Sequence, residues 1–192
     1  MLQNVSQHTS NMTAAAKPWL SDRMARGLSI AVFAALVILA FATFGAYGIS
    51  WDEEVQNTYG EKLLLFYASG LRDTSAFSFQ NLYLYGGFFD LLAAVLNLVS
   101  PFETYETRHL LGGLFGVVGY FGAWRLTRLL AGERAALLAL VMLACTPLLY
   151  GHNFINPKDA PFAWLTIWVA YFTCRAMAEA PAIKISTIVV AT

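Results

Sequence analysis

Residues 28–54 read LSIAVFAALVILAFATFGAYGISWDEE: an uncharged apolar run over 28–49 is followed by Trp51 and three consecutive carboxylates. A helix needs about 20 apolar residues to cross the roughly 30 Å hydrocarbon core of a bilayer. Tryptophan prefers the membrane surface, and charged side chains prefer the water beyond it. The stretch therefore predicts a membrane-spanning helix that presents the carboxylates of residues 52–54 at the membrane surface.

The composition is typical of a membrane protein. The chain is 58% hydrophobic and 12% charged, with a mean hydropathy of +0.56, whereas about 25% of the residues of a soluble domain are charged. The formal net charge is zero and the basic residues form no stripe, so no nucleic-acid partner is expected. Cys145 and Cys174 lie in apolar runs without CxxC spacing, which argues against a disulfide framework or a zinc site.

Further apolar stretches follow, and the basic residues decide which of them cross the membrane. These stretches cover 82–99, 109–124, 135–150, 160–178 and 183–192. Basic residues before the first span predict a cytoplasmic amino terminus, because positively charged loops stay inside. If 82–99 crossed, the arginines between 125 and 134 would lie outside. We therefore expect 82–99, which Asp90 interrupts, to lie at the surface, since a charge at the bilayer centre costs about 2.5–3.5 kcal/mol on insertion scales.

This topology predicts an all-α, polytopic transmembrane helix bundle in the plasma (inner) membrane. Residues 1–27 would form a cytoplasmic tail and residues 28–192 the transmembrane domain, with 51–107 as an outer loop of juxtamembrane helices. One of these is expected at 55–67, where apolar residues recur at helical spacing. The expected spans are 28–49, 109–124, 135–150 and 160–178, and 183–192 begins a further one.

Two acidic positions reach the same outer side in this topology, so they could form one site. Asp52 and Glu53 follow the first span, and Asp159 lies in the second outer loop, within GHNFINPKDAPF at 151–162. Asp52 or Glu53 could act as a general base or bind a cation; alternatively, the carboxylates only mark the water boundary. Asp159 could cap the following helix, with Pro161 in its first turn, and capping is compatible with a functional role.

Basic and polar residues near these acids are further candidates. Lys158 adds a mobile positive charge beside a helix amino terminus, which attracts anions such as phosphate. Arg108 is the one arginine expected at the outer end of a span, where it either binds phosphate or snorkels to the interface. His109 and His152 lack the i, i+4 spacing of a zinc pair, so hydrogen-bonding roles are favoured for them. Four glycines share one face of the second span and predict close helix packing. They are Gly112, Gly113, Gly116 and Gly119.

These residues resemble a known family. An acid pair directly after the first span, a long outer loop and an Asp-x-Pro-Phe segment at the fourth span are similar to the polyprenyl-phosphate-dependent membrane glycosyltransferases of the GT-C fold. The string at 151–162 is the more specific part of the pattern. The resemblance covers 28–178 and is closest to the bacterial relatives of protein O-mannosyltransferases and aminoarabinose transferases.

The resemblance implies a cell-envelope enzyme. It would transfer a hexose or pentose, with inversion, from a polyprenyl-phosphate carrier to a lipid, glycan or protein acceptor on the extracytoplasmic face. Asp52 matches the acid that deprotonates the acceptor hydroxyl, Glu53 its acidic neighbour, and Asp159 the acid that helps to organise the site. Lys158 and Arg108 would contact the phosphate as it leaves. A divalent cation remains open as a cofactor, and its ligands are unknown.

Two departures from the family pattern bear on this interpretation. Related aminoarabinose transferases carry a Glu-Lys-Pro segment in the outer loop, where this chain has YLYGG at 83–87, so the donor sugar and its phosphate contact stay open. The family usually has many more spans, and we expect this chain to be an amino-terminal part of the fold: a fragment, a truncated gene product, or a subunit that needs a partner chain to supply the missing helices. The alternatives are a non-catalytic membrane scaffold or subunit, and a small transporter in which Asp90 marks an ion path.

Overall fold

The computed structural model describes residues 20–179, and every regular element in this range is a helix. The elements are α2 (Asp22–Thr43), η1 (Phe44–Ala46), α3 (Glu53–Ala68), η2 (Ser75–Ser78), η3 (Leu82–Leu84), α4 (Phe88–Asn97), α5 (Thr104–Ala144), α6 (Pro147–Ile155) and α7 (Asp159–Glu179). The predicted all-α fold class is confirmed. Most of the expected cytoplasmic tail and the expected span beginning at 183 lie outside the described residues.

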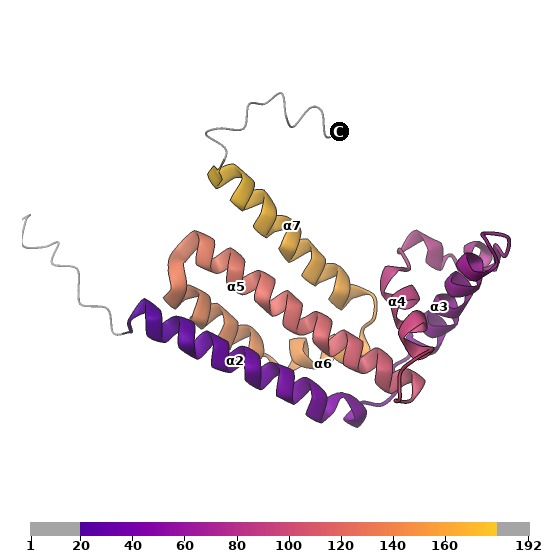
Figure 1. Ribbon diagram of the computed structural model, residues 1–192, viewed down its shortest axis with the longest axis horizontal. Helices are drawn as coiled ribbons and strands as arrows, with labels where there is room; N and C mark the ends of the chain where they lie inside the picture. Colours follow the sequence, from indigo (N-terminus) through magenta and orange to yellow (C-terminus); the bar gives the residue numbers. More distant parts are fainter. Residues whose placement is uncertain (1–19, 180–192) are drawn as a thin grey trace, which may run out of the picture.

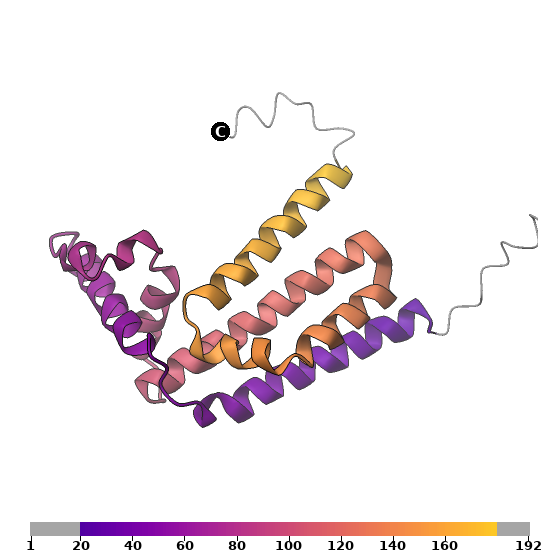
Figure 2. The same ribbon diagram turned by 180° about the vertical axis from the view of Figure 1, so that it is seen from behind.

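α5 is a helical hairpin with two arms that lie side by side (Figures 1 and 2). Gly132 breaks the helix at φ 86° and ψ 179°, a backbone conformation that glycine adopts because it has no Cβ. Arg26, at the start of α2, pairs with Glu133 at the start of the second arm, and Thr43, at the end of α2, lies 2.9 Å from the Tyr150 hydroxyl. The second arm therefore runs parallel to α2, and the first arm runs antiparallel to both.

The second arm is shorter than the sequence predicts. A single helix was expected over 135–150, but α5 ends at Ala144 and α6 starts at Pro147, and the two helices are bent by 66°. Proline lacks a backbone N–H and clashes with the preceding turn, so it begins a new helix instead of continuing the old one. The break directs α6 across the end of the bundle and leads the chain into the loop before α7 (Figure 2).

Small residues let the helices of the bundle approach closely. A Cβ on Gly112 would lie well inside 3.0 Å of the Asn153 backbone oxygen, and one on Gly119 would overlap the ring of Trp164. The predicted close packing along this face is therefore confirmed. Next to it lies an aromatic-rich core made of Leu36, Tyr120, Trp124, Ala136, Leu140 and Trp164.

The first helix has the properties of a membrane span. Among the described residues, Asp22–Ala46 is the one helix long and apolar enough to cross a membrane alone, and the rest of the chain leaves most of its surface uncovered. α5 and α6 meet the same criteria only as a bent pair. The second arm of α5 and α7 also expose large apolar side chains, for example Met142 and Val169, and exposed apolar surface of this kind is typical of contact with a membrane or with another protein.

α3 and α4 form a separate pair beyond the end of the bundle where α2 ends (Figure 1). Gly60 lets them approach so closely that a Cβ there would meet the Asp90 backbone carbonyl. α4 has 10 residues and so extends for about 15 Å, half the thickness of a hydrocarbon core. It is therefore too short to cross a bilayer, and the chain returns to the bundle through the loop before Thr104.

Candidate active site

The two neighbouring acids Asp52 and Glu53 have opposite environments. Asp52 is exposed at the N-cap position of α3, where its carboxylate accepts no capping hydrogen bond. Glu53 is 0% exposed. Its Oε2 accepts a hydrogen bond of 2.6 Å from the Ser50 backbone N–H, and its Oε1 lies 2.8 Å from Nε2 of His109. Glu53 therefore holds the loop in place, and Asp52 keeps a free carboxylate.

His109 joins this loop to the first turn of α5. Its ring is 1% exposed, and its Nδ1 lies 3.3 Å from the Phe44 carbonyl oxygen. Both ring nitrogens thus face an acceptor, so the two bonds are satisfied together when the imidazole carries two protons or when Glu53 carries one. Tyr47 stands edge-on to the His109 ring and stacks on Phe154 of α6 at 4.4 Å. The expected hydrogen-bonding role of His109 is confirmed.

The two predicted outer loops meet at a cavity of about 180 Å³. Its lining includes Asp52 from the first loop and Lys158 from the second. A hydrogen bond of 2.8 Å from the Ser50 hydroxyl to the Ile155 carbonyl joins the two loops directly. Residues more than 100 positions apart are therefore fixed together at this cavity. Its other lining residues are Ser50, Trp51, His152, Ile155, Asn156 and Pro157.

Asn156, which the sequence analysis did not single out, organises the second loop. Its Oδ1 accepts hydrogen bonds from the backbone N–H groups of Asp159 (2.9 Å) and Lys158 (3.3 Å), and its Nδ2 donates to the Asp159 carboxylate (3.2 Å). The capping oxygen at the start of α7 thus comes from Asn156, and the prediction that Asp159 supplies it is wrong. Asparagine is a preferred capping residue, which is the signal that could have identified it.

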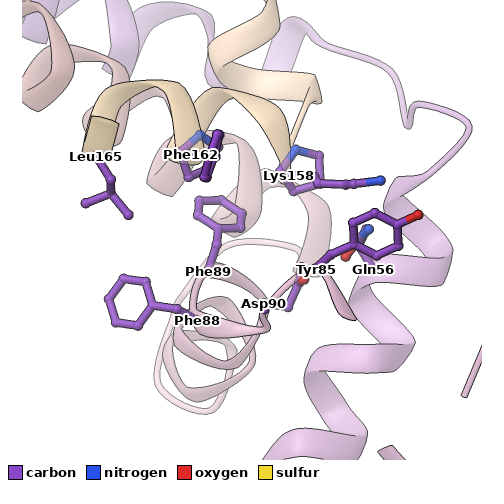
Figure 3. Close-up of a pocket in the computed structure, with 11 residues that line it drawn as sticks. Gln56, Tyr85, Phe88, Phe89, Asp90, Lys158, Phe162 and Leu165 are labelled. Atoms are coloured by element: carbon purple, nitrogen blue, oxygen red, sulfur yellow. The ribbon is translucent and has the colours of Figure 1, made fainter. Parts of the chain in front are cut away.

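Lys158 lies between this cavity and a second one of about 140 Å³ (Figure 3). Its Nζ lies over the Tyr85 ring, 3.7 Å from the centroid. It pairs with no carboxylate in the part of the chain that the structure describes. The second cavity is mainly apolar, with walls from α4 and α7 that include Phe88, Phe162 and Leu165.

Arg108 is an interior residue. It is 1% exposed and forms an ion pair of 2.5 Å with Asp90, also buried, and its guanidinium lies over the Phe89 ring. Burial raises the pKa of Asp90 to about 6, and the charge of Arg108 opposes that rise. Arg108 is therefore buried in the protein and not exposed at the membrane interface. Its Nε and Nη1 atoms have no hydrogen-bond partner among residues 20–179.

The described residues contain no group of three or more histidine, cysteine, aspartate or glutamate side chains placed to hold a metal ion. Both cysteines in this range are free thiols, Cys145 exposed and Cys174 partly buried. The cavity where the two loops meet is lined by one acidic and one basic side chain, Asp52 and Lys158.

Comparison with protein families gives one match. The family model of dolichyl-phosphate-mannose-protein mannosyltransferase covers residues 91–191, more than half of the chain. The matched range includes Arg108, Lys158 and Asp159, whereas Asp52 and Glu53 precede it. No curated protein and no solved structure matches the chain. The family consists of membrane-embedded, GT-C-type glycosyltransferases that use a lipid-linked sugar, which confirms the resemblance at this level. The chain belongs to the dolichyl-phosphate-mannose-protein mannosyltransferase family.

Proposed function

We propose that the chain transfers a sugar from a polyprenyl-phosphate carrier to an acceptor hydroxyl, with Asp52 as the general base. The observation that carries this proposal is a cavity lined by both the carboxylate of Asp52 and the ammonium of Lys158, neither of which has an ion-pair partner among residues 20–179. An acid–base pair of this kind suits a displacement in which a proton leaves the nucleophile and an anion leaves the sugar.

In the proposed reaction, the acceptor oxygen attacks the anomeric carbon as the bond from that carbon to the phosphate oxygen breaks. Asp52 accepts the hydroxyl proton, and the polyprenyl phosphate leaves as an anion beside Lys158. Attack opposite the leaving group inverts the anomeric configuration. Asp159 contributes by fixing Asn156, which holds the backbone at Lys158. Glu53 acts as a positioning residue for Asp52, because its own carboxylate is buried and bonded.

The mainly apolar cavity on the far side of Lys158 suits the lipid part of the donor. Phe88, Phe162 and Leu165 line it, and Phe88 and Phe162 are exposed, so an isoprenoid chain could lie there while its phosphate reaches the ammonium group (Figure 3). Arg108 lies behind this cavity in its ion pair with Asp90. Because that pair neutralises Asp90, an ion path through this residue is not favoured, and neither is the transporter alternative.

We further propose that α2, the first arm of α5, the second arm of α5 together with α6, and α7 cross the plasma membrane, with the amino terminus in the cytoplasm. Arg26, Arg128 and Arg175 lie at one end of these helices, and Asp52 and Asp159 lie at the other (Figures 1 and 2). Positively charged segments stay on the cytoplasmic side. The cavity with Asp52 would then face the extracytoplasmic side.

The test is sugar transfer by the purified chain in proteoliposomes with polyprenyl-phosphate mannose, read as release of polyprenyl phosphate. Asp52→Asn should lower kcat by at least about 10²-fold, the scale of general-base catalysis. Glu54→Gln is the matched control, since Glu54 is a neighbouring exposed carboxylate. Equal rates for the two variants would remove Asp52 from the reaction. A wild-type chain that releases no polyprenyl phosphate from this donor would favour the non-catalytic scaffold instead.

A further inference from the structure

Two arginines line a third, separate cavity at the end of the bundle opposite Asp52. This cavity has a volume of about 370 Å³ and is lined by Arg125, Arg128, Leu129 and Tyr171. Arg125 and Arg128 lie near the end of the first arm of α5, and Tyr171 lies on α7. The site thus forms between two helices that the hairpin turn brings together.

The two guanidinium groups are held in place by aromatic side chains. Arg125 lies over the rings of Phe121 (5.9 Å) and Tyr171 (5.1 Å) and donates a hydrogen bond to the Tyr171 hydroxyl. Arg128 lies over the ring of Trp124 at 5.2 Å. Arginines that only mark the cytoplasmic side of a membrane need no fixed orientation, whereas these two are oriented before any ligand arrives, which lowers the cost of binding one.

Carboxylates do not balance the charge of these arginines. Arg125 pairs with no carboxylate within the described range, and Arg128 shares the single carboxylate of Glu133 with Arg26. Over this end of the bundle, six arginines face three carboxylates. They are Arg23, Arg26, Arg125, Arg128, Arg134 and Arg175, against Asp22, Glu133 and Glu179. Like charges around one cavity repel each other, and a bound anion would relieve that repulsion.

We propose that Arg125 and Arg128, with the Tyr171 hydroxyl, form a binding site for a phosphate group. Guanidinium groups recognise phosphate through paired N–H donors, and basic pockets between membrane helices bind the head groups of acidic lipids. Leu129 beside the arginines, and Leu130 next to it, are both exposed and would lie against acyl chains. The phosphate would come from an acidic phospholipid or from a soluble phosphate compound.

The test is binding of phosphatidylglycerol to the purified full chain in detergent, with phosphatidylcholine as the neutral lipid and inorganic phosphate as the soluble probe. Native mass spectrometry counts bound lipid, and titration gives the Kd. Arg125→Gln should weaken binding by about tenfold or more, and added salt should weaken it in the wild type. Arg72→Gln is the matched control, because Arg72 is an exposed arginine at the other end of the molecule.

Each outcome is decisive. Preference for phosphatidylglycerol that Arg125→Gln removes and Arg72→Gln retains supports a lipid site. Arg125-dependent binding of inorganic phosphate without that preference supports a site for a soluble compound. Equal binding of both probes by wild type and Arg125→Gln overturns the proposal. If Arg125→Gln fails to fold, Tyr171→Phe, which keeps the ring and removes the hydroxyl, decides in its place: unchanged binding would overturn the three-residue site.

Discussion

Replacing Glu53 with glutamine tests the division of roles between the two neighbouring acids. In this division, Glu53 stabilises the fold of the site and Asp52 takes part in the reaction. The carboxylate of Glu53 accepts one hydrogen bond from the Ser50 N–H at 2.6 Å and faces Nε2 of His109 at 2.8 Å, with no solvent access. Glutamine supplies one acceptor oxygen and one donor NH2 group. The amide satisfies both contacts only when its oxygen accepts from Ser50 and its NH2 group donates to Nε2, which requires a neutral His109 with its proton on Nδ1; a doubly protonated His109 would leave one contact donor against donor, with no water to replace it.

With a doubly protonated His109, the size of the effect follows from the loss of this buried ion pair. A buried donor without an acceptor costs about 1–3 kcal/mol, and the removal of one partner from a buried ion pair costs about 3–5 kcal/mol. We expect Glu53→Gln to lower the free energy of unfolding by about 2–4 kcal/mol, between these two cases. For a protein of this size the melting temperature should fall by roughly 4–16 °C, at about 2–4 °C per kcal/mol.

The assay is thermal unfolding of the purified protein in detergent, together with sugar transfer. Glu54→Gln, which changes an exposed neighbour on the same turn, should unfold within about 0.5 kcal/mol of the wild type. A double-mutant cycle of Glu53→Gln with His109→Gln should show a coupling of about 0.5–3 kcal/mol, because the two side chains are in contact. If Glu53→Gln is as stable as Glu54→Gln and still abolishes sugar transfer, then Glu53 takes part in the reaction and the purely structural role given to it is wrong.

Three further predictions concern packing, protonation and topology. Gly112→Ala places a Cβ against a backbone oxygen of α6 and should lower the free energy of unfolding by about 1–3 kcal/mol by overpacking. The control is Gly27→Ala, whose Cβ meets nothing within 4 Å and which should be neutral or slightly stabilising in thermal unfolding. Equal effects of the two variants would contradict the close packing at Gly112. Because burial raises the pKa of Asp90 to about 6, the folded state binds this proton more tightly than the unfolded state. Stability should therefore fall as the pH rises from about 4 to 6; melting curves of Asp90→Asn should lack this slope, and an unchanged slope would assign it elsewhere. Single cysteines at the exposed positions 131 and 152, in a background without other cysteines, should react with an impermeant thiol reagent from opposite sides of the membrane, whereas reaction from one side would contradict the proposed crossings.

The helices were largely predictable from the sequence because hydrophobic periodicity and helix start signals are local. The expected helix at 55–67 lies within α3, and α7 begins where Pro161 marks a first turn. The 82–99 stretch forms only a short regular helix, α4, and its surface location stays a prediction. The break after Ala144 was not predicted, because the apolar run continues on both sides of it. Pro147, the first residue of α6, is the local signal for the break.

The pairing of buried polar side chains could not be predicted in the same way. Glu53 and His109 are 56 residues apart, and their contact depends on how α3 and α5 pack, which no local pattern encodes. The sequence offered both Asp52 and Glu53 as candidate catalytic acids and placed Arg108 at the outer end of a span. The structure instead buries both side chains: Glu53 lies against His109, and Arg108 pairs with Asp90.

The difference between buried, paired charges and charges that line a cavity separates residues that stabilise the site from residues that can take part in the reaction. A buried charge that already has a partner cannot exchange that partner for a substrate without the cost of an unpaired charge, so Glu53 and Arg108 are expected to maintain structure. Asp52 and Lys158 lack ionic partners in the described part of the chain and line a cavity, so either can meet a proton or a phosphate at little structural cost. Substitutions at Asp52 and Lys158 should therefore change transfer at nearly constant stability, whereas substitutions at Glu53 and Arg108 should change stability first and transfer as its consequence.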